Sequence, residues 1–149
     1  MALVTDRVFI EITLLTVYMS LKLVHISIVV DDYDRAIDHY TRQLGFHLTE
    51  DTRLSETKRW VLVTPPGSAC SLLLAKAANE EQSTRIGNQT GGRVFLFLHT
   101  DSFDDDYERL QKQQVEIVRE AALEPHGKVA VFKDLYGNLW DLIQPGYSS

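Results

Sequence analysis

Two stretches of the sequence decide the fold: VHISIVVD at residues 24–31 and VFLFLHTD at residues 94–101. They align without a gap, and the match continues, because YD at residues 33–34 aligns with FD at residues 103–104. Each stretch is a run of β-branched or aromatic residues that ends in an acidic turn, which is typical of a strand leading into a helix. Self-similarity at a fixed spacing indicates an internal repeat, so we expect two copies of one structural unit.

The acidic turns predict where the helices begin. Residues 31–32 and residues 101–102 have short oxygen side chains, which accept hydrogen bonds from the unpaired N–H groups of a first helical turn. Apolar residues then recur at helical spacing in both copies, and Gly45 is a natural stop for the first helix. Each repeat therefore starts with a strand and a capped helix.

Three further strands are expected in each copy, so the unit is β-α-β-β-β and the fold class is α+β. The predicted pairs of equivalent strands are Phe46–Glu50 with Val115–Arg119, Lys58–Val63 with Gly127–Phe132, and Ser71–Ala75 with Leu139–Ile143. The polar segment 77–92 is then a linker between module one, residues 21–76, and module two, residues 93–145. Together they form a single domain within residues 19–149.

Composition excludes several classes of partner. The chain has 149 residues, a formal net charge of −6 and one cysteine. An acidic chain without a basic face favours neither nucleic acid nor an anionic membrane. A single cysteine, Cys70, forms no internal disulfide, so we expect a cytoplasmic protein. The apolar segment Val8–Met19 is interrupted by Glu11 and is too short to span a membrane. We expect residues 1–18 to be an upstream extension or a non-native leader.

The order of these elements resembles the glyoxalase/bleomycin-resistance/extradiol dioxygenase superfamily, also called the vicinal oxygen chelate superfamily. The resemblance rests on LVHI at residues 23–26, DLYGN at residues 134–138 and LWDLIQ at residues 139–144. It covers residues 21–145. It implies that the two modules form a half-open, barrel-like mixed sheet around a cleft. It also implies a homodimer, with the cleft formed either within one chain or between two.

In the metalloenzymes of this superfamily, four equivalent positions that face the cleft hold a divalent metal. The repeat alignment places His25 and Phe95 at the two first-strand positions, and Leu73 and Asp141 at the two last-strand positions. Only His25 and Asp141 carry donor atoms, whereas catalytic zinc sites use three protein ligands. We therefore expect no metal site and no cofactor, although a divalent metal held weakly by two of the four ligands stays possible. His99 is no substitute, because it lies four residues, or about 13 Å, along the strand from Phe95.

Strand alternation predicts the side chains that line the cleft instead. His25 and Ser27 share one face of the first strand, and Phe95, Phe97 and His99 share one face of its repeat. Such a surface suits an apolar or aromatic small molecule oriented by a few polar groups.

Two more residues complete the expected ligand-binding set. Trp60 offers a stacking surface, and His126 lies in a loop that overhangs the cleft in similar proteins. The phenylalanines and Trp60 are also explained by simple core packing. We expect His39 and His47 to be exposed and Tyr136 to lie at the surface.

Three functions stay open. The first is a binding protein for an apolar or aromatic molecule, without turnover. The second is a lyase or dioxygenase-type enzyme in which His25 and Asp141 are catalytic, with a weakly held metal or none. In the third, side chains fill the cleft and only dimerisation matters.

Overall fold

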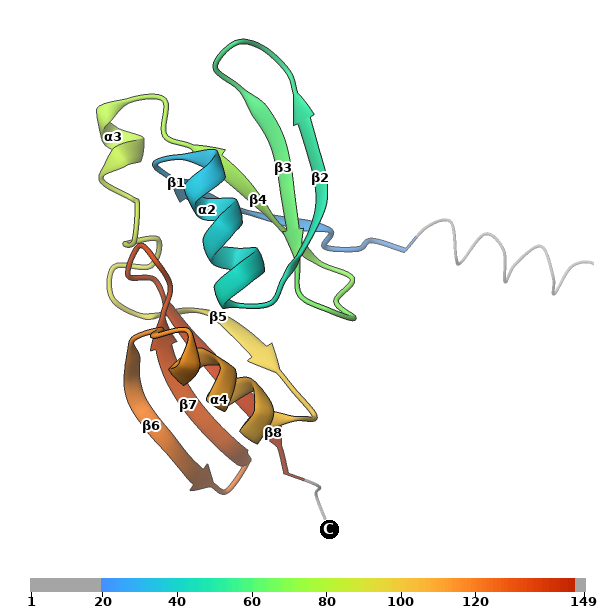
Figure 1. The fold of residues 1–149 in the computed structure, drawn as a ribbon, viewed down its shortest axis with the longest axis vertical. Coiled ribbons are helices and arrows are strands. Elements are labelled where there is room, and N and C mark those ends of the chain that lie inside the picture. The colour runs from blue at the N-terminus through green and yellow to red at the C-terminus, as the bar shows by residue number, and fades with distance from the viewer. Residues whose placement is uncertain (1–19, 147–149) are drawn as a thin grey trace, which may run out of the picture.

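The structure is a computed structural model that describes residues 20–146, so the predicted extension at residues 1–18 lies outside the described residues. The first module contains β1 (His25–Val30), α2 (Tyr33–Asp38), the π-helical turn η1 (His39–Gln43), β2 (His47–Arg53), β3 (Arg59–Thr64) and β4 (Ser71–Lys76). A short helix, α3 (Glu80–Ser83), lies in the connection. The second module contains β5 (Val94–His99), α4 (Phe103–Lys112), β6 (Ile117–Glu124), β7 (Gly127–Lys133) and β8 (Leu139–Pro145). The modules lie end to end, with α2 and α4 on the same side (Figure 1).

The modules have the same strand order, which confirms the α+β class and the repeated β-α-β-β-β unit. One sheet has the order β1-β4-β3-β2 and the other β5-β8-β7-β6. In each, the first strand pairs in parallel with the last, and the remaining pairs are antiparallel. They are two separate four-stranded sheets and do not close into a barrel.

The predicted cap of the first helix is confirmed, because the Arg35 N–H donates to Asp32 Oδ1 at 2.8 Å. The second helix begins differently. Ser102 makes no side-chain cap hydrogen bond. The N–H of Phe103 instead donates to Gln144 Oε1 at 2.9 Å. A side chain from β8 thus takes the role that the sequence assigned to the turn.

One aromatic core joins the two modules. Tyr40 of η1 lies 5.9 Å from Phe46 and 6.3 Å from Trp140 of β8, between ring centroids. Trp140 also stacks on Phe132 of β7 at 6.0 Å. All four side chains are buried. The first module therefore packs against the side of the second sheet that α4 covers.

A buried carboxylate fixes this junction. Asp134, in the turn between β7 and β8, accepts six hydrogen bonds. One comes from the Tyr40 hydroxyl at 2.7 Å and one from the Trp140 indole N–H at 3.1 Å. The turn that helped to identify the family resemblance is thus a hub for hydrogen bonds between the modules.

The expectation that His39 is exposed is wrong, because its side chain lies in this junction and is only 3% exposed. His39 Nε2 accepts the Leu135 N–H at 2.9 Å, so Nδ1 carries the proton and donates to Gln43 Oε1. Burial lowers the pKa of His39, although Gln43 and Asp134 act in the opposite direction. Tyr136 is half-buried, and its hydroxyl donates to Asp31 Oδ1 at 2.8 Å. His47 is exposed, as predicted.

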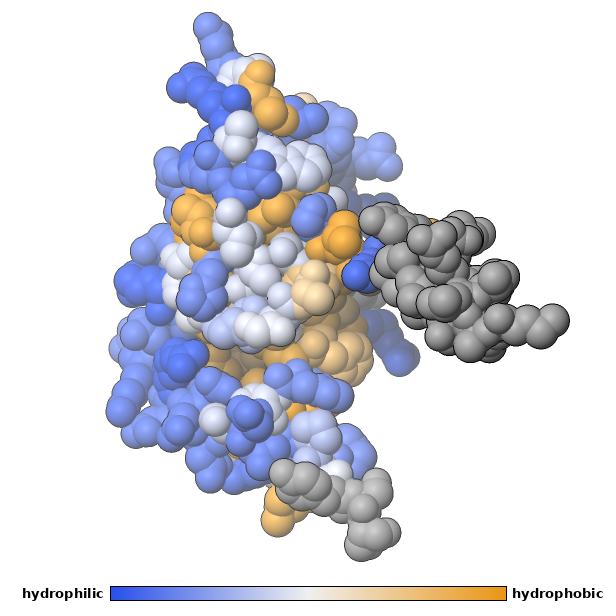
Figure 2. Space-filling model, turned by 90° about the vertical axis from the view of Figure 1, so that its right-hand side faces the viewer, coloured by the Kyte–Doolittle hydropathy of each residue, from blue (hydrophilic) through white to orange (hydrophobic). Residues whose placement is uncertain are grey.

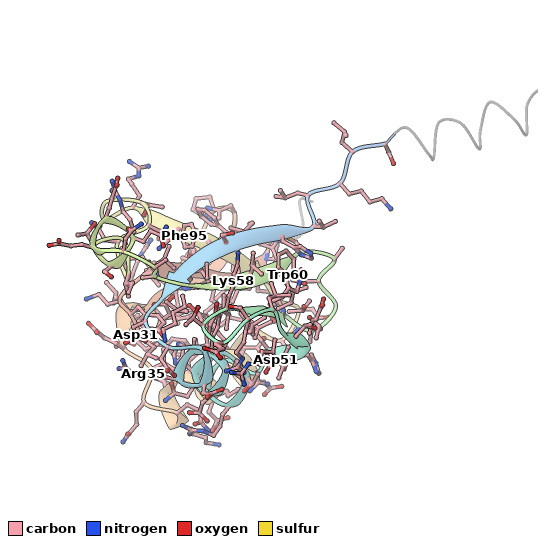
Figure 3. The ribbon with its side chains drawn as sticks, turned by 90° about the horizontal axis from the view of Figure 1, so that it is seen from above. Asp31, Arg35, Asp51, Lys58, Trp60 and Phe95 are labelled. Atoms are coloured by element: carbon pink, nitrogen blue, oxygen red, sulfur yellow. The ribbon has the colours of Figure 1, made fainter. Side chains whose placement is uncertain are left out.

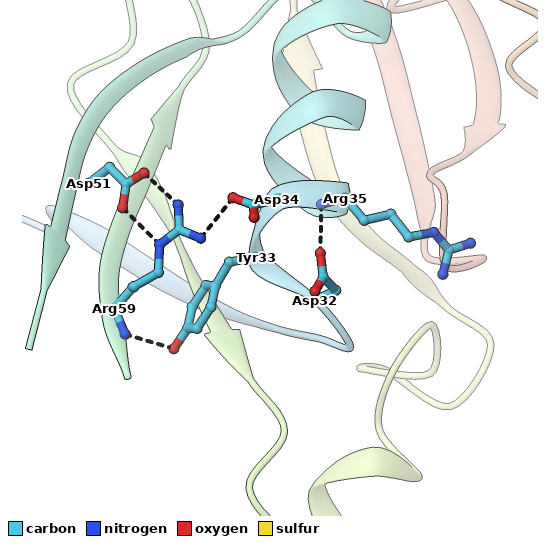
Figure 4. A network of polar contacts seen from close by, with 6 residues as sticks. All are labelled: Asp32, Tyr33, Asp34, Arg35, Asp51 and Arg59. Carbon is cyan, nitrogen blue, oxygen red and sulfur yellow. Dashed lines mark hydrogen bonds and ion pairs between the residues drawn. The ribbon is translucent and has the colours of Figure 1, made fainter. Parts of the chain in front are cut away.

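Arg59 ties the β2–β3 hairpin to α2 (Figure 4). Its guanidinium donates to Asp51 at 2.6 and 3.0 Å and to Asp34 at 2.7 Å. Its backbone N–H donates to the Tyr33 hydroxyl at 3.2 Å. Between residues 20 and 146, no helix is long and apolar enough to cross a membrane.

Candidate functional site

Each sheet has a second face, opposite the side that packs on the core. On β1, Ile28 and Val30 are fully buried, so the alternating His25 and Ser27 point to the other face. We call the faces that carry His25 on the first sheet and Asp141 on the second the free faces. Viewed from above, Trp60 and Phe95 lie on the β1 side of the molecule, away from α2 (Figure 3).

Rows of cross-strand neighbours define these faces, because register partners on adjacent strands point to the same side of a sheet. In the second module the row runs through Phe97, Asp141, Val131 and Arg119. In the first module the equivalent row runs through Ser27, Leu73, Leu62 and Glu50. Leu73 lies opposite Ser27 as Asp141 lies opposite Phe97, so the repeat alignment placed these residues at equivalent sites.

The aromatic side chains of the free faces are accessible to different degrees. Phe97 is 62% exposed, whereas Phe95, which lies where β5 changes register, is half-buried and packs against the hydrophobic core. Trp60 is also half-buried and makes an edge contact with His25, with 6.1 Å between ring centroids. Phe97 therefore offers an accessible apolar ring on the free face, whereas six of the aromatic side chains between residues 20 and 146 are buried.

His25 and Asp141 share a property that draws attention to both. His25 Nδ1 and Asp141 Oδ1 are buried atoms without a hydrogen-bond partner in the described part of the chain. No hydrogen bond joins the two side chains, which belong to different sheets. A buried polar atom without a partner is rare and costs about 1–3 kcal/mol.

Charged groups surround Asp141. Burial raises the pKa of the Asp141 carboxyl, while the positive charges of Arg119 and His126 act in the opposite direction. Arg119 is itself ion-paired with Glu124 of the same strand. The sequence reasoning missed Arg119, because β6 changes register on both sides of it and the simple alternation fails there.

The remaining predicted ligand-binding residues are at the surface. Ser27 is exposed in the middle of β1, and His126 is exposed in the β6–β7 turn. His99 is exposed at the end of β5, where it lines a groove between the modules. The structure thus brings Trp60 beside His25, and His126 close enough to Asp141 to act on its pKa. His99 pairs with Ile143, two residues along β8 from Asp141.

The donor atoms for a metal are few. Of the four equivalent positions, His25 and Asp141 carry ligating atoms, and Phe95 and Leu73 carry none. Within residues 20–146, no group of three or more His, Cys, Asp or Glu side chains is placed to hold a metal ion. These residues do not fit the four-ligand site of the metalloenzymes.

Known proteins with similar sequences and structures agree with this architecture. An uncharacterised protein of Shewanella frigidimarina (strain NCIMB 400) is 57% identical over 128 residues, which cover 85% of this chain and 95% of that protein. The crystal structure of UcmS2 superposes with a TM-score of 0.73 at 32% identity, covering 84% of this chain and 98% of the other. TnmS3, an antibiotic-binding protein from Streptomyces sp. CB03234, superposes with a TM-score of 0.69 at 30% identity, covering 86% and 98%.

The family comparison covers most of the chain. A family model for the Glyoxalase/Bleomycin resistance protein/Dioxygenase superfamily matches residues 22–142, which include both modules and both free faces. This chain therefore belongs to the Glyoxalase/Bleomycin resistance protein/Dioxygenase superfamily.

Proposed function

We propose that this protein binds an apolar or aromatic small molecule on its free faces, without a complete metal site. The observation that carries the proposal is the pairing of exposed aromatic surface with two buried, unpartnered polar atoms, His25 Nδ1 and Asp141 Oδ1. Binding sites for small molecules combine apolar walls with a few well-placed polar groups. The structural similarity to TnmS3, which is an antibiotic-binding protein, supports a small-molecule ligand.

The polar atoms indicate what the ligand must offer. Asp141 Oδ1 is an acceptor when the carboxyl is ionised, and His25 Nδ1 donates or accepts depending on the tautomer. A ligand with a hydroxyl or amide group near each atom would restore the missing hydrogen bonds. Its rings would lie against Phe97 and Trp60, which provide flat apolar contact area.

We further propose that the cleft forms between two copies of the chain. The first module packs on the helix-covered side of the second sheet, through Tyr40 and Trp140, rather than on the free face. A two-fold axis would set the first-module free face of one copy opposite the second-module free face of the other, and would repeat the contact symmetrically. Such a homodimer would contain two equivalent clefts.

The competing function is a lyase or dioxygenase-type enzyme that uses the same two residues. The unpartnered atoms of His25 and Asp141 are compatible with proton transfer as well as with binding. With only two protein ligands, water would fill most of the coordination positions of a divalent metal. We therefore propose that His25 Nδ1 and Asp141 Oδ1 orient the ligand itself.

A neutral fluorescent probe tests the binding proposal. N-phenyl-1-naphthylamine gains fluorescence in apolar sites, and we expect saturable binding with one probe per chain. Phe97→Glu should weaken binding at least tenfold, because it places a charge on the aromatic wall. Leu54→Glu is the matched control, since Leu54 is 53% exposed in the β2–β3 hairpin and lies outside the free-face rows.

The controls decide the result. Equal loss of binding in the Phe97 and Leu54 variants, or fluorescence that never saturates, would contradict a site on the free faces. His25→Ala and Asp141→Asn should weaken binding less than Phe97→Glu does and should leave the circular dichroism spectrum unchanged.

A further inference from the structure

A hollow lies where the two modules meet. It has a volume of about 690 Å³ and is lined by the end of η1, the β3–β4 turn, the end of β5 and the first turns of α4. Leu98 lines it and alternates along β5 with Phe97, so the hollow lies on the opposite side of the sheet from the free face. We call it the inter-module groove. On the face of the molecule shown in Figure 2, apolar residues gather at mid-height, between more hydrophilic ends.

The floor of the groove is apolar and comes from both modules. Phe46 contributes from the first module, and Phe132 and Leu142 contribute from the second. These side chains belong to the aromatic core that joins the modules, so the floor is held in place by buried packing. The volume lies within the range of sites that bind small organic molecules, about 300–1,000 Å³.

The α4 wall of the groove carries unbalanced negative charge. Asp104 points elsewhere and is paired with Lys128, and Asp106 accepts from Thr100 at 2.6 Å. Asp105 lines the groove and is exposed, without an ion-pair or hydrogen-bond partner in the described part of the chain. Asp101 lines the groove as well, and within residues 20–146 its carboxylate accepts only from the Ser102 hydroxyl, at 3.3 Å.

The one arginine that lines the groove does not cancel this charge. Arg109 Nη1 lies 3.4 Å from Asp106 Oδ1, so its charge is balanced by that carboxylate. Its guanidinium lies over Gly45, where a Cβ would approach Nη1 to 2.6 Å. Arg109 thus contacts both modules at one part of the groove. It does not neutralise the negative charges of Asp101 and Asp105.

We propose that the inter-module groove is a second ligand site, separate from the free faces, that binds a small organic cation. The apolar body of the cation would lie on Leu98 and Leu142, and its ammonium group would lie near Asp105 and Asp101. An anion would meet repulsion from both carboxylates, and a bare metal ion would gain nothing from the apolar floor. The two carboxylates and the apolar floor together therefore favour an amphiphilic cation.

Titration of the full-length, isotope-labelled chain with hexyltrimethylammonium tests this site by nuclear magnetic resonance. We expect saturable shifts of the backbone amides of Leu98, Asp101 and Asp105, and none with heptanoate, whose alkyl chain also has six carbons. Asp105→Asn should weaken binding about threefold, in keeping with an exposed charge contact, and added salt should weaken it further.

Asp104→Asn is the matched control, because it removes the same charge from the same turn of α4 outside the groove. It should leave the affinity unchanged. The proposal is overturned if both variants lose affinity equally, if heptanoate binds as well as the cation, or if the shifts fall on Phe97 and Asp141. In that last case the cation uses the free face, which leaves the proposed function standing and removes the second site.

Discussion

The hydrogen-bond hub at Asp134 gives the sharpest prediction about stability. Replacing Asp134 with asparagine keeps the size of the side chain but exchanges one acceptor oxygen for an NH₂ donor. If the remaining oxygen keeps the three backbone donors of the turn, at 3.0–3.1 Å, the NH₂ group faces Tyr40, Asn138 and Trp140. The Tyr40 hydroxyl can rotate and accept. The Asn138 side-chain amide can accept only by flipping, which takes its oxygen away from the Gln89 N–H, and the indole N–H of Trp140 can only donate.

The structure sets the size of the effect. Asn138 is 3% exposed and Trp140 is 1% exposed, so water does not replace the lost acceptor. Each buried donor left without a partner costs about 1–3 kcal/mol. Asp134→Asn should therefore lower the free energy of unfolding by about 3–5 kcal/mol. Tyr40→Phe removes one donor and leaves the carboxylate its other partners, so it should cost only about 1–2 kcal/mol.

Urea-induced unfolding, followed by circular dichroism at low temperature, measures both variants. If Asp134→Asn is too unstable to fold, the Tyr40→Phe variant still tests the network, because its smaller loss is within the stability of an ordinary domain. A loss below about 1 kcal/mol for Asp134→Asn would refute the reasoning, since it would mean that the buried donors find other partners.

Three further predictions concern single residues and the metal content. Gly87→Ala should unfold at clearly lower urea than Gly91→Ala: both glycines have positive φ, but only at Gly87 would a Cβ meet backbone, 1.9 Å from the Tyr136 oxygen. His39 has a lowered pKa, so the unfolded chain binds more protons than the folded one, and unfolding at pH 5.5 should need less urea than at pH 7.5. His39→Asn should reduce this pH dependence, and an unchanged slope would contradict the assignment. Elemental analysis of protein purified without chelators should find far less than one divalent metal per chain, and near-stoichiometric metal would contradict the ligand-orienting role of His25 and Asp141.

The sequence predicts the repeated unit because strand alternation and helix caps are local patterns. It also places Asp141 and Leu73 correctly as equivalent positions, because the last strands align with each other once two residues are gapped between the first and last strands of the repeat. The burial of His39 is not readable from local pattern, since it depends on a contact with Leu135, 96 residues away. Arg119 is missed for a different reason, because bulges in β6 break the two-residue period that identifies a sheet face.

We propose that the ligand lies in a cleft shared by two copies of the chain. Trp60→Ala damages the first-module free face, and Phe97→Glu damages the second-module free face, so each variant alone should bind N-phenyl-1-naphthylamine poorly. When the two variants are refolded together, about half of the dimers should be mixed, and each mixed dimer should contain one intact cleft. We expect about a quarter of the wild-type probe-binding capacity to return on refolding the mixture. No recovery beyond the sum of the separate variants would contradict the shared cleft.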